Sequence, residues 1–240
     1  DVACQVSHVV LLNSNFASMP SVVMEGRRVI NNIERSASLF LVKNIFSFVM
    51  ALISLIFTLP YPLTPAQISL VSTLSIGIPS FVLAMEPNES LVRGKFMRNV
   101  IFRALPGGLT DVILIVGVML FYIAFDFPTQ EMSTICAIIM GVVGMLVLHR
   151  ICIPYNRIRK LLMISMSATF VFMLIFFREL FTLTELTFSS KLVLMVFVFL
   201  AYPLMKTLSY GLEGLKSSFE ESRSRTKKRA GRHVAAARKR

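Results

Sequence analysis

The chain has 240 residues, of which 55% are hydrophobic and 16% are charged, and its mean hydropathy is +0.71. This composition excludes an ordinary water-soluble domain and favours a protein that lies mostly in a membrane. The formal net charge is +12, and residues 213–240 alone hold ten Lys or Arg against three Glu. The positive charge is therefore concentrated at one end of the chain.

The first segment, residues 1–17, contains a β-branched apolar run, VSHVVLL, followed by the turn residues NSN. The pattern predicts a short strand that leads into a helix, as at the end of an α/β domain. A segment this short cannot bury a core of its own, and the chain begins at Asp1 without an initiator Met. We therefore expect the sequence to be a piece of a longer protein whose α/β domain lies upstream.

Residues 18–37 carry charged and amide side chains in the run EGRRVINNIER and continue without a break into the apolar run 38–59. The pattern predicts one helix that begins in water as a stalk and ends in lipid. In isolation, EGRRVINNIER also fits a solvated amphipathic helix held by charge pairs between neighbouring turns. Its position directly ahead of an apolar run favours the stalk.

Six apolar runs are each near the length of about 20 residues that a helix needs to cross a bilayer. They cover residues 38–59, 66–85, 104–126, 133–152, 160–178 and 191–211. We expect an all-α membrane protein in which residues 38–212 form a six-helix transmembrane bundle. Lys and Arg gather in alternate connections, which predicts that both termini are cytoplasmic, and an even number of spans agrees with this.

Polar side chains interrupt the first span at Lys43, Asn44 and Ser47. Lys43 and Ser47 share one stripe of the helix with Ser36 and Ser54, whereas Asn44 lies about 100° away from Lys43. A polar stripe within a span is expected to face the bundle or a water-filled cavity. Lys43 has two interpretations: it reaches the cytosolic headgroups, or it is a tethered counter-ion that fills a cation site after the cargo has left.

The second span contains Pro79, which removes the backbone hydrogen bond that would otherwise reach the carbonyl of Ser75. Ser72 and Ser75 add hydroxyl groups, and Gly77 loosens the backbone between them and the proline. This stretch offers several neutral oxygens to a dehydrating cation. It fits a simple packing kink equally well, since Pro and Gly are common in membrane helices.

The interior of the remaining spans contains one acid, Asp111, which we expect to pair with Arg103 or Lys43 rather than to bind ions directly. Gly107 and Gly108 predict a close approach between two helices. Spans four to six are expected to serve as scaffold. Residues 213–240 have almost no large apolar side chain, so we expect a disordered tail that attracts anionic lipid headgroups; a nucleic-acid arm is the less favoured alternative beside a membrane.

The run VACQVSHVVLLNSNFASMPSVVMEGRRVINNI resembles the join between the phosphorylation domain and the fifth transmembrane helix of P-type cation-transporting ATPases. Further along, IGIPSFVLAMEPN resembles bacterial pumps of the cation-transporting ATPase E type, often linked with calcium. The resemblance implies that residues 1–17 end the phosphorylation domain, and that 18–37 form the coupling stalk. Its landmarks in the stalk are Glu25, Gly26, Arg27, Asn31 and Asn32.

The resemblance also implies a cation pathway in the first two spans, where Asn44 and Pro79 match family positions, with Ser47, Ser72 and Ser75 beside them. An acid that calcium pumps carry in the second of these spans is replaced by Ile76, and residues 44–85 contain no carboxylate. The acid for a calcium or other divalent ion would therefore come from a span in the N-terminal half of the same pump. That half would also hold the ATP and Mg sites and the phosphorylated Asp, in a bacterial plasma membrane.

Two other functions remain open on the residues alone. One is a self-contained six-span carrier or channel subunit, in which the same polar stripe lines a passive route. The other is a membrane scaffold whose basic tail recruits partners. The sequence contains no phosphate loop, zinc spacing or nucleophile beside a base, so we expect no catalysis by this segment alone.

Overall fold

The computed structural model describes residues 2–11, 15–92, 94–126 and 128–237, with side chains described as far as Gly214. The described part of the chain is helical. Its α-helices are α1 (Val2–Val6), α2 (Met19–Phe57), α3 (Pro65–Ser72), α4 (Ile78–Met85), α5 (Phe96–Phe125), α6 (Thr129–Cys152), α7 (Arg157–Phe176) and α8 (Phe188–Ala237). The described residues also form two short helical elements: η1 (Phe16–Ser18) is a 3₁₀ turn and η2 (Thr73–Gly77) is a π-helical turn.

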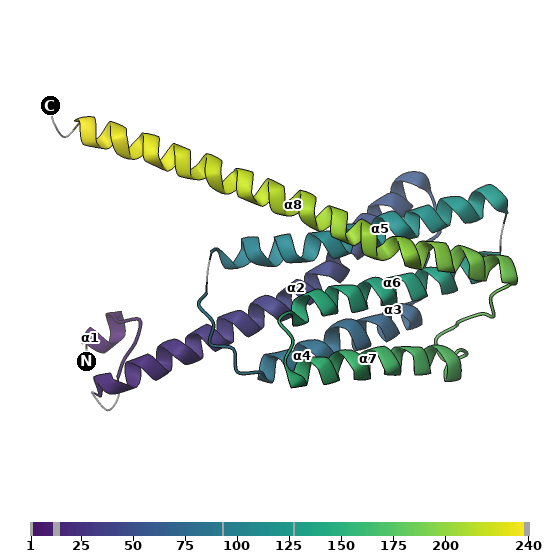
Figure 1. Cartoon of the computed structure of the whole chain (residues 1–240), viewed down its shortest axis with the longest axis horizontal. Coiled ribbons are helices and arrows are strands. Elements are labelled where there is room, and N and C mark those ends of the chain that lie inside the picture. Colours follow the sequence, from purple (N-terminus) through teal and green to yellow (C-terminus); the bar gives the residue numbers. More distant parts are fainter. Residues whose placement is uncertain (1, 12–14, 93, 127, 238–240) are drawn as a thin grey trace.

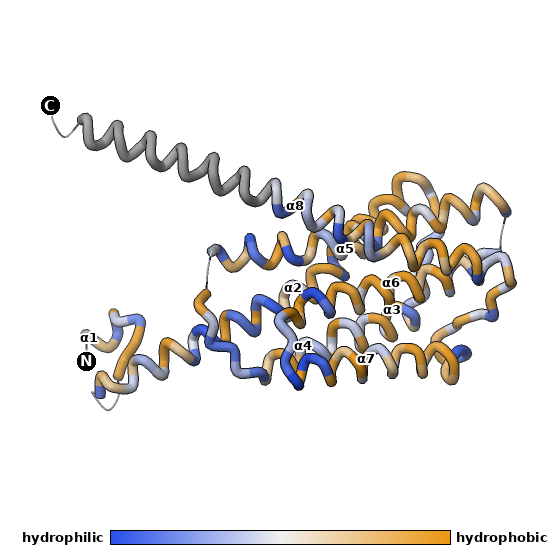
Figure 2. The backbone as a smooth tube through the Cα atoms, in the orientation of Figure 1, coloured by the Kyte–Doolittle hydropathy of each residue, from blue (hydrophilic) through white to orange (hydrophobic). Residues whose placement is uncertain are grey.

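Six helical segments among the described residues are long and apolar enough to cross a membrane, which confirms the predicted number of spans. They run over Phe16–Phe57, Pro65–Met85, Phe96–Phe125, Thr129–Cys152, Arg157–Phe176 and Phe188–Gly214. Both α2 and α8 project from the same end of the bundle (Figure 1). Figure 2 shows that hydrophilic residues gather at this end, where α2 leaves the bundle, whereas the spans themselves are hydrophobic.

The first span and its stalk form one helix, as expected. α2 has 39 residues, which corresponds to a length of about 58 Å. Pro20 stands in its first turn, where a proline costs no hydrogen bond, and Thr58, which follows the last residue of the helix, has a left-handed conformation with a φ of 53°. α2 therefore runs without a break from the stalk into the bundle.

The centre of the bundle is formed by α5 and α6. In their apolar stretches, 50% and 61% of the residues are buried, against 11% in that of α8. The predicted close approach at the glycine pair is confirmed. A Cβ at Gly108 would lie 2.8 Å from Cγ2 of Ile45 on α2, and a Cβ at Gly107 would overlap Cγ2 of Val147 on α6. α2, α5 and α6 therefore meet at one level of the bundle.

Neither expectation about the ends of the chain is confirmed. The described residues 2–11 form no strand, because an isolated strand has no neighbour to accept its backbone hydrogen bonds. The backbone of residues 213–237 is not disordered but continues α8 as a helix (Figure 1). This segment is rich in Ala, Arg, Lys and Glu, which are good helix formers, and it extends an existing helix without a new nucleation step.

Candidate functional site

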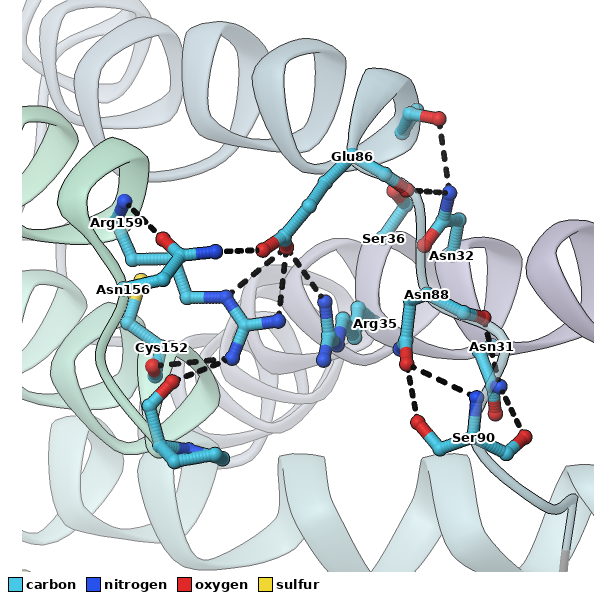
Figure 3. Close-up of polar contacts among 12 residues, drawn as sticks. Asn31, Asn32, Arg35, Ser36, Glu86, Asn88, Ser90, Cys152, Asn156 and Arg159 are labelled. Atoms are coloured by element: carbon cyan, nitrogen blue, oxygen red, sulfur yellow. Dashed lines mark hydrogen bonds and ion pairs between the residues drawn. The ribbon is translucent and has the colours of Figure 1, made fainter.

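A buried ionic network joins the stalk to the bundle at the hydrophilic end (Figure 3). Glu86, which follows the last residue of α4, has a side chain that is only 4% exposed. Its Oε2 accepts hydrogen bonds from Arg35 Nη1 on α2 at 2.9 Å and from Arg159 Nε on α7 at 2.9 Å. Asn156, which caps α7, donates to the other carboxylate oxygen. We call Glu86, Arg35, Arg159 and Asn156 the Glu86 network.

The two stalk asparagines hold the chain that follows α4. Asn32 Nδ2 donates to the carbonyl oxygens of Ala84 and Glu86, both at 2.9 Å, and Asn31 Nδ2 donates to the carbonyls of Asn88 at 3.1 Å and Ser90 at 2.8 Å (Figure 3). The carbonyls of Ala84 and Glu86 lie at the end of α4, where the helix itself provides no partner, and those of Asn88 and Ser90 lie in the connection that follows. Asn31 and Asn32 therefore fix the second span to the stalk.

The other landmarks of the stalk lie further from the bundle. Glu25 is exposed and pairs with Arg28 one turn later at 3.3 Å. Gly26 is exposed, and a Cβ there would find nothing within 4 Å. Arg27 is half-buried. None of the three takes part in the Glu86 network.

A second buried acid, Glu34, lies on the stalk and connects α2 to α5. Its carboxylate pairs with Arg103 Nη1 at 3.0 Å and accepts from Asn99 Nδ2 at 3.3 Å. Sequence reasoning missed this contact and the Glu86 network. The sequence does indicate such contacts, because a charged residue at the end of an apolar run needs a partner once helices pack around it.

Deeper in the bundle, residues of α2, α3, η2, α5 and α6 line a small, partly open cavity of about 20 Å³. This is room for about one water-sized occupant. Its polar lining consists of Lys43 from α2, Ser72 and Ser75 from the second span, and Asp111 from α5. We call it the Lys43 cavity; its other walls are the apolar residues Leu39, Val42, Val71, Ile76, Met140, Gly144 and Val147.

The second span changes its helical form where it borders this cavity. The amide of Ile78 bonds to the carbonyl of Thr73, five residues back, so the backbone widens into the π turn η2. Pro79 follows directly and has no amide hydrogen with which to restore the α-helical register. π turns of this kind are frequent at functional sites. The prediction of a loosened backbone before Pro79 is confirmed, as a π turn within a continuous helix.

The hydroxyl groups near the π turn differ in their contacts. Ser75 Oγ donates to the carbonyl of Val71 at 2.6 Å, whereas Ser72 Oγ is buried with no hydrogen-bond partner. Gly144 on α6 faces Ser75, and a Cβ there would lie 2.8 Å from the serine Cβ. The glycine therefore brings α6 against the π turn.

The polar stripe of α2 follows the second span along its length. Ser36 Oγ donates to the carbonyl of Ser80 at 3.4 Å, Lys43 lines the cavity, and Ser47 is hydrogen-bonded to Tyr61 in the connection to α3. Burial raises the pKa of Tyr61, and this hydrogen bond offsets part of the rise. Ser47 is thus on the stripe but outside the Lys43 cavity.

Asn44 is not brought to the cavity. Its side chain is exposed on another face of α2, away from the stripe. One helical position corresponds to a rotation of about 100°, which is enough to turn Asn44 out of the bundle while Lys43 points into it. Pro79 is buried but likewise does not line the cavity.

Comparison with known proteins identifies relatives of this chain, although no family model matches it. The chain is 35% identical over 196 residues to the probable cation-transporting ATPase exp7 of Streptococcus pneumoniae serotype 4, covering 76% of this chain and 25% of that protein. It is 35% identical over 185 residues to the calcium-transporting ATPase CtpE of Mycobacterium tuberculosis, covering 69% and 23%. The CtpE protein of Mycolicibacterium smegmatis is 40% identical over 114 residues, covering 43% and 14%.

The chain spans about a quarter of the length of the exp7 and Mycobacterium tuberculosis CtpE proteins. Their names are those of ATP-hydrolysing cation pumps, and two of the matches extend over more than two thirds of this chain. The described residues add six apolar helices of spanning length. The resemblance in the sequence is thereby confirmed: homologues of this chain are cation-transporting ATPases, in agreement with the C-terminal membrane part of a P-type ATPase.

Proposed function

We propose that this chain is the membrane segment of an ATP-driven P-type cation pump and supplies part of its cation-binding and translocation pathway. Calcium or another divalent cation is the favoured cargo, in keeping with the names of the CtpE relatives. The single observation that carries the proposal is the continuity of α2. One helix holds the stalk contacts of the Glu86 network at one end and the Lys43 cavity further along.

In this proposal, residues 1–17 end a phosphorylation domain, 18–37 form the stalk, and 38–212 form the transmembrane domain. The stalk residue Asn32 precedes Lys43 by 11 positions, a rise of about 17 Å along the helix. A displacement of the phosphorylation domain would move α2 together with the end of α4, because Asn31, Asn32 and Arg35 bind them to each other. We expect the second span to bend at the π turn next to the cavity.

Lys43 acts in the proposal as a tethered counter-ion. Two unit charges about 4 Å apart repel by about 4 kcal/mol at an effective dielectric constant of 20, and a divalent cation doubles this. A cation in so small a cavity and the ammonium group of Lys43 therefore exclude each other. Lys43 would occupy the site once the cargo has left, and a further acid from an upstream span would complete the site for a divalent ion.

The pump would lie in a bacterial plasma membrane with both termini in the cytoplasm. An N-terminal half of the same protein would bind ATP and Mg and carry the phosphorylated Asp. The basic residues 213–240 would attract anionic lipid headgroups rather than nucleic acid. Cys4, which is exposed, gives a test of the orientation. An impermeant maleimide should label it only after the cells are opened.

The function is tested with the full-length protein reconstituted into vesicles. We expect ATP hydrolysis that needs Mg, is stimulated by calcium or another divalent cation and is inhibited by vanadate, together with ATP-dependent uptake of that cation. Cation flux without nucleotide would instead support the passive carrier or channel. A protein with neither flux nor hydrolysis would be a scaffold, and both results would refute the pump.

A further inference from the structure

Asp111 is a buried acid with an oxygen that has no hydrogen-bond partner among the described residues. It lies on α5, one turn beyond the Gly107–Gly108 contact with α2, and only 2% of the residue is exposed. Its Oδ1 atom has no hydrogen-bond partner. Burying a polar atom without a partner is costly, and such an atom in a native structure needs an explanation.

The neighbouring polar groups do not explain it. Thr110 satisfies its own hydroxyl by donating to the carbonyl of Pro106 at 2.6 Å. Arg103, one of the two partners expected from the sequence, pairs with Glu34 instead. Lys43 lines the same cavity as Asp111, yet within the described part of the chain no ion pair within 4.0 Å joins the two.

Two buried oxygens without hydrogen-bond partners thus belong to residues from different helices that line the same small space. Asp111 Oδ1 from α5 and Ser72 Oγ from the second span are both buried without partners, and both residues line the Lys43 cavity. The space is large enough for one dehydrated ion or one water. Carboxylate and hydroxyl oxygens are the ligands that hard cations prefer.

We propose that Asp111 is a direct ligand of the transported cation, and that its carboxylate is bound in turn by the cation and by the ammonium of Lys43. This inference rests on the proposed pump function and adds to it an acid from α5. It assigns the negative charge that the second span lacks, where Ile76 lines the cavity. When the cation leaves, Lys43 neutralises the carboxylate, so the cavity never holds an isolated charge.

The test compares Asp111→Asn with Asp126→Asn in the full-length protein. Asp126 ends the same helix, and the substitution makes the same chemical change at an exposed position. We expect Asp111→Asn to weaken the apparent affinity for calcium in the ATPase assay by about tenfold or more, as for loss of a charged ligand. We expect Asp126→Asn to match the unmodified protein. An affinity within twofold of the unmodified protein for Asp111→Asn would overturn the inference.

A second measurement settles the matter if Asp111→Asn fails to fold, and it uses Lys43→Ala, in which no ammonium neutralises the carboxylate. Dicyclohexylcarbodiimide reacts with buried protonated carboxyl groups in membranes, and the modified residue is located by mass spectrometry. We expect Asp111 to be modified in the cation-free Lys43→Ala protein and to be protected by saturating calcium. Modification that calcium does not alter would overturn the inference. If the protein without substitutions hydrolyses no ATP in response to any cation, the proposed function itself has failed. That result is distinct from a failure of the inference about Asp111.

Discussion

The Glu86 network gives the sharpest test of how the stalk is held. In Glu86→Gln the side chain keeps its shape and loses its charge, so the guanidinium groups of Arg35 and Arg159 stay buried without a counter-charge. The three side chains are 4%, 12% and 7% exposed. Removing one partner of a buried ion pair costs about 3–5 kcal/mol. For a domain of this size each kcal/mol lowers the melting temperature by about 2–4 °C, so we expect a fall on the order of 10 °C.

Thiol exposure provides the assay. Cys136 and Cys152 are buried, and Arg159 Nη1 donates to the carbonyl of Cys152 at 3.4 Å, so loosening the network should expose that cysteine early. With the exposed Cys4 replaced by Ser, a thiol-reactive fluorescent dye should report the unfolding of the bundle on heating.

The matched control is Glu185→Gln. Glu185 pairs with Arg178 at 3.0 Å, but its side chain is 89% exposed. A surface pair of this kind contributes about 0–1 kcal/mol, so the melting temperature should change by less than about 4 °C. Equal melting temperatures for the two variants would refute the view that a buried network holds the stalk to the bundle.

Three further predictions concern the helix contact and the cavity. Gly108→Ala should destabilise the protein by about 1–3 kcal/mol, because the new Cβ would lie 2.8 Å from Ile45, whereas Gly26→Ala, with nothing within 4 Å, should be neutral or stabilising by up to about 1 kcal/mol. Equal melting temperatures would contradict this. Pro79→Ala should let the π turn close and weaken apparent cation affinity by about tenfold, the effect of about 1.4 kcal/mol; unchanged affinity would count against a role for the turn. Lys43→Ala should alter the number of cations moved per ATP, measured as uptake over hydrolysis, and unchanged stoichiometry and affinity would exclude the counter-ion.

Much of the architecture could be predicted because it depends on local properties. The number of spans follows from the length of each apolar run, and the continuity of α2 follows from the absence of a breaker between its stalk and its span. The stripe of Ser36, Lys43 and Ser47 follows from helical periodicity. These features need only the rise and twist of a helix and the thickness of a bilayer.

The ends of the chain could not be predicted in the same way. The run VSHVVLL has strand-like composition, but a strand exists only when a neighbouring strand pairs with it. Residues 213–237 lack the apolar side chains of a core, yet they are helical because α8 already provides the preceding turns. In both cases the conformation depends on what stands next to the segment.

The sequence by itself determined six spans, one unbroken stalk helix and the face on which its polar residues lie. Only the tertiary structure decided which polar groups meet. Glu86 and Arg159 are 73 positions apart, and Asp111 lines the same cavity as Lys43 without an ion pair. Helical geometry is repeated at every residue, whereas the partner of a buried charge is chosen by the packing of distant helices.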